Sequence, residues 1–167
     1  GAVYIQFMNT DGTVKSYQKI STGIGGGPTL NAEDFFGTSV TAIGDLDQDG
    51  VIDLAIGAEG DDTGSSQRGA VYVCFMNVDG TVKSITKIAS EMNGAPLLST
   101  SDYFGSAVVA IGDLDSDGIP DLAVGAKYDG LEGGVFILLM NSDGSVRESQ
   151  VIGANEIPDL KGGRRFG

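Results

Sequence analysis

The sequence contains no histidine and no tryptophan, and only one of its 167 residues is cysteine. Without histidine there is no imidazole to act as a general base or to bind zinc, which excludes Ser-His-Asp and Cys-His catalysis within this chain. The single cysteine, Cys74, excludes an internal disulfide. Because Cys74 lies in the apolar run 71–76, we expect a small buried side chain rather than a nucleophile. These absences predict that the chain is not an enzyme.

Positive charge is also scarce. The sequence has 10 Lys and Arg residues against 23 Asp and Glu residues, a formal net charge of −13. Such a surface repels nucleic acid and anionic membranes, so neither is an expected partner. No apolar run is long enough for membrane insertion as a helix, and the chain opens at Gly1 inside a strand-like pattern, so we expect any targeting signal to lie outside it. With 41% hydrophobic residues, a chain of this length fits one domain with an ordinary core.

The acidic residues gather in two loops of nearly identical sequence, DLDQDGVID at 45–53 and DLDSDGIPD at 113–121. Unit charges about 4 Å apart repel by roughly 1 kcal/mol even in water, so crowded carboxylates favour a bound cation. Positions 1, 3 and 5 can aim three carboxylates at one point, position 7 offers a backbone carbonyl and position 9 adds a carboxylate. Gly at position 6 allows the sharp bend. The pattern predicts two Ca²⁺ sites, with ligands from Asp45, Asp47, Asp49, Val51 and Asp53 and from Asp113, Asp115, Asp117, Ile119 and Asp121.

Other interpretations of the loops explain less. An EF-hand needs a bidentate Glu at position 12 and a helix on each side, but position 12 is Ile56 or Val124. The flanking segments 39–44 and 52–57 are short, rich in β-branched residues and closed by Gly, which indicates strands. A solvated acidic turn needs no ion, but two copies that keep all their carboxylates favour a metal site. Magnesium is less favoured because it dehydrates reluctantly.

The repeat extends beyond the acidic loops. The opening segment GAVYIQFMN (1–9) recurs as GAVYVCFMN (69–77) and, more loosely, as GGVFILLMN (133–141). Each copy is followed by Asp-Gly, a strong hairpin signal because Gly supplies a positive φ. A more polar segment follows each turn, at 14–20, 82–88 and 146–152. These segments carry the basic residues typical of an outer strand with an open edge, namely Lys15, Lys19, Lys83, Lys87 and Arg147.

One unit therefore contains four antiparallel strands, with the acidic loop between the first and the second. The third strands are apolar on both faces, as expected for a sheet packed between two neighbouring sheets. Repeats of this length indicate a propeller or solenoid. A sandwich is the alternative, but loops that recur at one strand junction favour radial packing. The predicted fold class is all-β, with β-propeller blades of four antiparallel strands, two of them complete and others partial, and strand-loop-strand calcium sites.

The sequence resembles the FG-GAP repeat family, which forms propeller blades in the amino-terminal head of integrin α subunits. Both elements of the name are matched twice, by Phe36-Gly37 with Gly57-Ala58 and by Phe104-Gly105 with Gly125-Ala126. Glu59 and Lys127 replace the Pro that usually follows, which predicts a less fixed loop beyond. The calcium motif of the family falls on the four aspartates of each loop.

This phasing makes residues 1–167 a single propeller segment. Residues 1–20 are the outer strands of a preceding blade, 36–88 and 104–152 are complete blades, and 166–167 open a further blade. Known propellers close with typically four to eight blades, so we expect either a longer polypeptide or an assembly of copies, as a homo-oligomer or filament. The resemblance favours the longer polypeptide, because integrin members of the family form complete rings.

The resemblance implies a calcium-binding module of an extracellular or cell-surface protein that acts in protein interaction or cell adhesion. Extracellular calcium modules fill at about 10⁻³ M calcium, which agrees with an external location. The expected partner is another protein or the remainder of the chain's own propeller. Two alternatives stay open: an accessory propeller of a secreted hydrolase, and a carbohydrate-binding propeller that would recognise a glycan.

Overall fold

The computed structural model describes residues 1–128 and 133–153, which form β-strands joined by turns and loops and contain no helix. No helix able to span a membrane is therefore found in these two ranges. The strands are β1 (Val3–Met8), β2 (Val14–Ile20), β3 (Val40–Gly44), β4 (Asp53–Ala58), β5 (Ala70–Met76), β6 (Val82–Ala89), β7 (Phe104–Gly112), β8 (Asp121–Ala126), β9 (Gly134–Met140) and β10 (Val146–Gly153).

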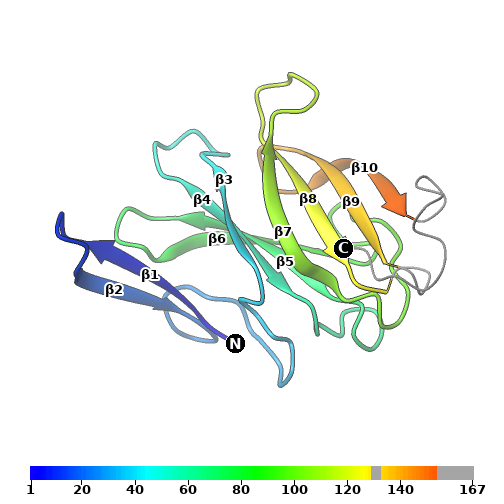
Figure 1. Ribbon diagram of the computed structural model, residues 1–167, viewed down its shortest axis with the longest axis horizontal. Helices are drawn as coiled ribbons and strands as arrows, with labels where there is room; N and C mark the ends of the chain where they lie inside the picture. The colour runs from blue at the N-terminus through cyan, green and yellow to red at the C-terminus, as the bar shows by residue number, and fades with distance from the viewer. Residues whose placement is uncertain (129–132, 154–167) are drawn as a thin grey trace.

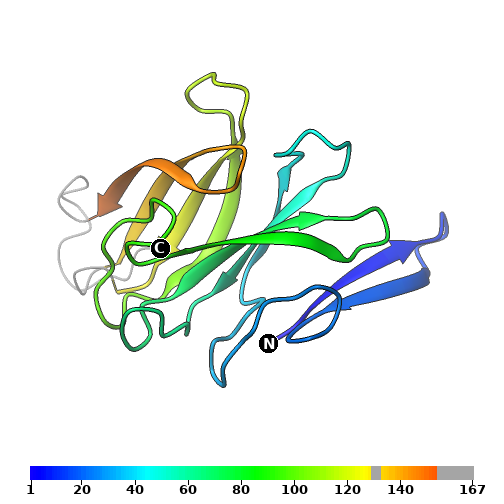
Figure 2. The same ribbon diagram turned by 180° about the vertical axis from the view of Figure 1, so that it is seen from behind.

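The strands form three antiparallel sheets. β1 and β2 make a two-stranded sheet, which we call the half-blade; β3-β4-β5-β6 make the first full blade and β7-β8-β9-β10 the second. The sheets follow one another in chain order, with the first full blade between the other two (Figures 1 and 2). The predicted all-β fold with four-stranded antiparallel blades is confirmed. The exact blade limits stay a prediction, and residues 166–167 lie outside the described ranges.

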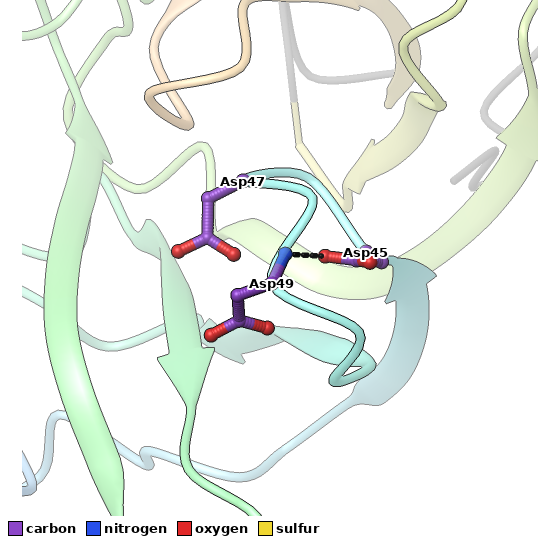
Figure 3. A group of neighbouring side chains, drawn as sticks. All are labelled: Asp45, Asp47 and Asp49. Atoms are coloured by element: carbon purple, nitrogen blue, oxygen red, sulfur yellow. Dashed lines mark hydrogen bonds between the residues drawn. The ribbon is translucent and has the colours of Figure 1, made fainter.

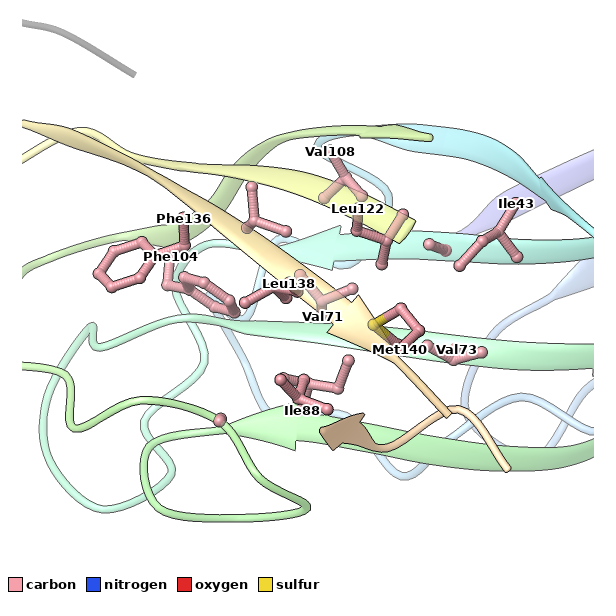
Figure 4. Close-up of a cluster of buried hydrophobic side chains, with 14 of the residues drawn as sticks. Ile43, Val71, Val73, Ile88, Phe104, Val108, Leu122, Phe136, Leu138 and Met140 are labelled. Atoms are coloured by element: carbon pink, nitrogen blue, oxygen red, sulfur yellow. The ribbon is translucent and has the colours of Figure 1, made fainter. Parts of the chain in front are cut away.

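The first full blade is packed on both faces, as its sequence predicts. Every residue of β5 is buried. Because side chains alternate along a strand, Val71 and Val73 enter the core shared with the second full blade (Figure 4), whereas Tyr72 and Cys74 enter the core shared with the half-blade. The apolar run of this strand thus joins three sheets into one packed body.

The second full blade is packed on one face only, among the described residues. Its third strand, β9, alternates between buried and half-buried positions. Phe136, Leu138 and Met140 lie in the core against the first full blade, while Ile137 and Leu139 lie on the other face, beside a shallow apolar hollow. The sequence of β9 therefore has an apolar face that the described part of the chain does not cover.

The Asp-Gly hairpins form where the sequence places them. In the first, the N–H of Gly12 donates to the carbonyl of Asn9 at 3.0 Å, and Gly12 has φ 84°. The carboxylate of Asp11 accepts the N–H of Thr13 at 2.9 Å, which fixes the turn. Gly80 and Gly144 repeat this conformation, with φ of 82° and 76°.

Successive blades meet through backbone contacts that leave no room for a side chain. A Cβ atom at Gly69 would lie 2.1 Å from the carbonyl oxygen of Phe104, and one at Gly57 would lie 2.0 Å from that of Gly105. The N–H of Phe104 also donates to the carbonyl of Arg68 at 2.9 Å. The Phe-Gly element of one repeat is therefore the docking point for the preceding blade.

We predict that Gly69→Ala destabilises the protein strongly, because the new methyl group collides with backbone that cannot move alone. The expected loss is about 3 kcal/mol of unfolding free energy, from overpacking together with strain at φ 83°. Urea denaturation measures it. Gly12→Ala is the matched control, with φ 84° but nothing within 4 Å of its Cβ position, and should cost about 1 kcal/mol. Equal losses for the two variants would show that the interblade contact is unimportant.

Candidate metal centre

Each acidic loop joins the first two strands of a full blade. Residues 45–52 connect β3 to β4, and residues 113–120 connect β7 to β8. Both loops project from the same end of the sheets (Figures 1 and 2). The strand-loop-strand arrangement predicted from the flanking sequences is therefore present, without the helices that an EF-hand requires.

Three carboxylates converge in each loop. Asp45, Asp47 and Asp49 each offer an oxygen within 4.8 Å of the others, as do Asp113, Asp115 and Asp117. In Figure 3 the carboxylates of Asp47 and Asp49 lie next to each other, and the carboxylate of Asp45 accepts a hydrogen bond from the backbone N–H of Asp49. Positions 1, 3 and 5 are thus brought together in both copies, and hard divalent cations prefer oxygen ligands of this kind.

Hydrogen bonds inside the loop fix the orientation of the carboxylates. In the first loop Asp45 accepts the N–H of Asp49 at 3.0 Å through Oδ1 and the N–H of Gly50 at 2.9 Å through Oδ2. Asp49 in turn accepts the N–H of Val51 at 2.9 Å. The second loop repeats all three bonds, from Asp117 and Gly118 to Asp113 at 3.0 and 2.8 Å and from Ile119 to Asp117 at 2.9 Å. The backbone therefore presents the same acidic cluster twice.

Comparison with known sequences agrees with this geometry. A profile described as an FG-GAP-like repeat matches residues 45–124, which contain both acidic loops. The chain belongs to the FG-GAP repeat family. Integrin alpha-3 of Cricetulus griseus is 35% identical over 172 aligned residues, which cover 100% of this chain and 15% of that protein. Integrin alpha-6 of Homo sapiens is 41% identical over 119 residues, covering 70% of this chain and 10% of that protein. The chain thus spans only a small part of the length of these integrin alpha subunits.

A departure from the FG-GAP pattern is accommodated by an ion pair. Glu59 and Lys127, which stand where the family usually has Pro, lie in successive repeats and pair with each other. The carboxylate of Glu59 is the less exposed partner, with 16% of its side chain accessible against 41% for Lys127. The two replacements therefore link the segments that follow β4 and β8.

Position 4 of each loop adopts a conformation that the sequence did not reveal. Gln48 has φ 59° and Ser116 has φ 64°, both in the left-handed region. Gly50 and Gly118, at position 6, have φ of 88° and 89°, as the predicted sharp bend requires. Each loop thus has left-handed backbone at two residues, of which only the glycine could be recognised from the sequence.

Position 9 of each loop is set apart from the cluster. Asp53 and Asp121 begin β4 and β8, are fully buried, and do not join the groups of three converging carboxylates found in the described residues. Asp53 accepts the N–H of Leu46 at 3.0 Å and that of Met76 at 2.9 Å, and so ties the loop to β5. Asp121 does the same with Leu114 at 2.8 Å and Met140 at 3.0 Å. Burial raises the pKa of Asp53 above its usual value, although the two backbone bonds oppose this effect.

A basic side chain from the fourth strand contacts each acidic cluster. Lys83 on β6 forms ion pairs with Asp47 and Asp49, and Arg147 on β10 forms ion pairs with Asp115 and Asp117. The hydrogen bond from Lys83 lowers the pKa of Asp49, and the bond from Val51 adds to it. From the sequence these basic residues were interpreted only as protection of an open strand edge. Their recurrence one residue after Val82 and Val146 was the available signal for a role at the loops.

The only cysteine is unsuited to chemistry. Cys74 is fully buried in β5, and burial raises the pKa of its thiol to about 12. A thiol of this kind stays protonated and inaccessible at neutral pH. The expectation that Cys74 is a buried core residue is confirmed.

We predict that Asp53→Asn and Asp121→Asn each destabilise the protein even without metal. The two backbone N–H groups donate to different carboxylate oxygens. In an amide one of these oxygens is replaced by an NH2 donor, so one buried N–H loses its partner at a cost of about 1–3 kcal/mol. Chemical denaturation in the presence of a chelator measures this loss. Asp11→Asn, in an exposed turn, is the control and should change stability by less than about 0.5 kcal/mol. If Asp53→Asn and Asp121→Asn are as stable as Asp11→Asn, the aspartate at position 9 does not have the structural role assigned to it.

Proposed function

We propose that the chain is a calcium-binding propeller module of an extracellular or cell-surface protein, which acts in protein interaction or cell adhesion. The observation that supports calcium binding most directly is the convergence of positions 1, 3 and 5 in two loops with the same internal hydrogen bonds. The two loops differ at positions 4, 7 and 8 but adopt the same arrangement, which favours a shared ligand over two accidental acidic turns.

The proposed ligands are those of the sequence prediction. Asp45, Asp47 and Asp49 supply carboxylate oxygens in the first loop, and Asp113, Asp115 and Asp117 do so in the second. The carbonyls of Val51 and Ile119 would add oxygens at position 7. Asp53 and Asp121 would complete the sites at position 9, because a carboxylate oxygen that accepts one N–H keeps a second lone pair. Calcium tolerates this flexible geometry better than magnesium does.

The role of the ion would be structural. Each loop holds two strands of a blade at one end of the sheet, and its carboxylates repel one another unless a cation lies between them. A bound divalent ion would therefore hold the loop in one conformation and present a rigid rim to a partner.

The adhesion role is drawn from the relatives, which are named integrin alpha subunits. Because a fold does not determine a function and the chain covers 15% or less of these proteins, the partner is also a proposal. We favour another protein or further blades of the same propeller. The half-covered apolar face of β9 supports a neighbouring blade, supplied by more polypeptide or by another copy of the chain. A glycan, or a hydrolase domain for which the chain is an accessory, has no comparable observation in its favour.

We predict that calcium raises the melting temperature and that EDTA lowers it. Calcium at 100 times the dissociation constant stabilises a protein by about 2.7 kcal/mol for each site, which corresponds to several degrees for a domain of this size. Differential scanning calorimetry in the two conditions measures the shift. Identical melting temperatures with calcium and with EDTA would contradict a structural ion.

Isothermal titration calorimetry tests the site assignment. The unmodified protein should bind two calcium ions, and Asp49→Ala and Asp117→Ala should each lose one of them. Asp11→Ala removes the same charge outside the loops and should keep both. Two undiminished sites in Asp49→Ala or Asp117→Ala would show that the ligands are wrongly assigned.

A further inference from the structure

Lys83 and Arg147 occupy the same place in the two repeats. Each follows the valine that begins the fourth strand of its blade, and each reaches across to positions 3 and 5 of the acidic loop. Lys83 contacts Oδ2 of Asp47 and Oδ2 of Asp49, and Arg147 contacts Oδ2 of Asp115 and Oδ2 of Asp117. Two repeats with different basic residues thus form the same pair of contacts.

These contacts fall on the oxygens that the rest of the loop leaves unused. Both oxygens of Asp45 accept backbone N–H groups, and Oδ1 of Asp49 accepts the N–H of Val51. The remaining oxygen of Asp49 and the near oxygen of Asp47 are therefore the ones most available to a cation. Lys83 holds both of them, with 36% of its side chain still accessible to solvent.

A lysine ammonium and a calcium ion cannot share these oxygens without strong repulsion. Both are cations that would stand within a few ångströms of each other, where even unit charges repel appreciably in water and a divalent ion doubles the effect. Calcium binding therefore requires the basic side chain to leave. Conversely, at low calcium the basic side chain neutralises part of the charge that would otherwise push the loop open.

We propose that Lys83 and Arg147 are built-in competitors of calcium, which hold the acidic loops closed at low calcium and are displaced when the ion binds. This inference rests on the proposed calcium sites and adds their regulation. The competitor lowers the calcium affinity of each site and so sets the concentration at which it fills. When calcium binds, the displaced side chain of Lys83 or Arg147 becomes a free cation at the end of the blade that carries the acidic loop.

Lys15 provides a matched control within the chain. It stands at the same place of the half-blade, one residue after Val14, and is exposed. Within residues 1–167 no acidic loop precedes it in its own unit. Changing Lys15 removes the same charge from the same type of strand position without touching either acidic cluster.

The test is a calcium titration by calorimetry in a protein that carries Asp117→Ala. Because this change removes the proposed second site, the heat measured comes from calcium binding to the first loop. Lys83→Met keeps the apolar stem of the side chain and removes its charge. We expect it to bind calcium roughly tenfold more tightly, because a cation within a few ångströms of the ion no longer opposes it. Lys83→Arg keeps the competitor and should stay within about threefold of the unmodified residue. Lys15→Met should leave the affinity unchanged.

The direction in which Lys83→Met changes the calcium affinity distinguishes competition from a purely structural role of Lys83. If Lys83 only shaped the loop, its loss would weaken calcium binding. Competition predicts the opposite, together with a lower melting temperature for Lys83→Met in EDTA, so that calcium shifts the melting temperature of this variant more. Unchanged or weaker binding by Lys83→Met, when the parent binds calcium, would overturn this inference alone. Absence of binding in every protein, including the unmodified chain, would overturn the proposed function itself.

Discussion

Repulsion among the carboxylates of each acidic loop is the constraint on which the arrangement of the site depends. Four aspartates within nine residues can be folded together only if each carboxylate finds a donor or a cation. The structure satisfies them in three ways. Backbone N–H groups of the loop donate to Asp45. The N–H groups of Leu46 and Met76 donate to Asp53. Lys83 forms ion pairs with Asp47 and Asp49.

The packed sheets of the blades hold the ends of these loops in place. Asp53 begins β4 directly opposite Gly44 at the end of β3, so the loop closes across one pair of adjacent strands. The strand beyond, β5, is buried along its whole length between two cores. Close contact between the backbone at Gly69 and that at Phe104 then fixes the next blade, with its own loop, beside the first. The two acidic clusters therefore project from neighbouring, tightly packed sheets.

Local patterns in the sequence predicted most of the fold. Alternation of apolar residues and the Asp-Gly turns located the strands, because these signals act between residues that are near in the chain. The spacing of aspartates at positions 1, 3 and 5 located the converging carboxylates for the same reason. The family resemblance agreed with both and added the order of the repeats.

Features that depend on distant residues were not predicted. Lys83 reaches Asp47 only because β6 lies two strands from β4, and strand register cannot be read from composition. The contact of Gly57 with Gly105 joins successive blades, so it could not be predicted from the residues near Gly57 in the chain. Asp53 was expected beside the other aspartates, but strand pairing buries it and gives its oxygens to backbone donors. The lone pairs that these donors leave unused are the ones proposed to bind the ion.

A crystal structure grown with millimolar calcium, with anomalous data collected for that element, tests the central claim most directly. The account predicts one anomalous peak in each loop, with carboxylate oxygens of Asp45, Asp47 and Asp49 at about 2.3–2.6 Å from the first peak, and with Lys83 turned away from the aspartates. Loops without a peak, in which Lys83 and Arg147 remain on the carboxylates, would contradict it.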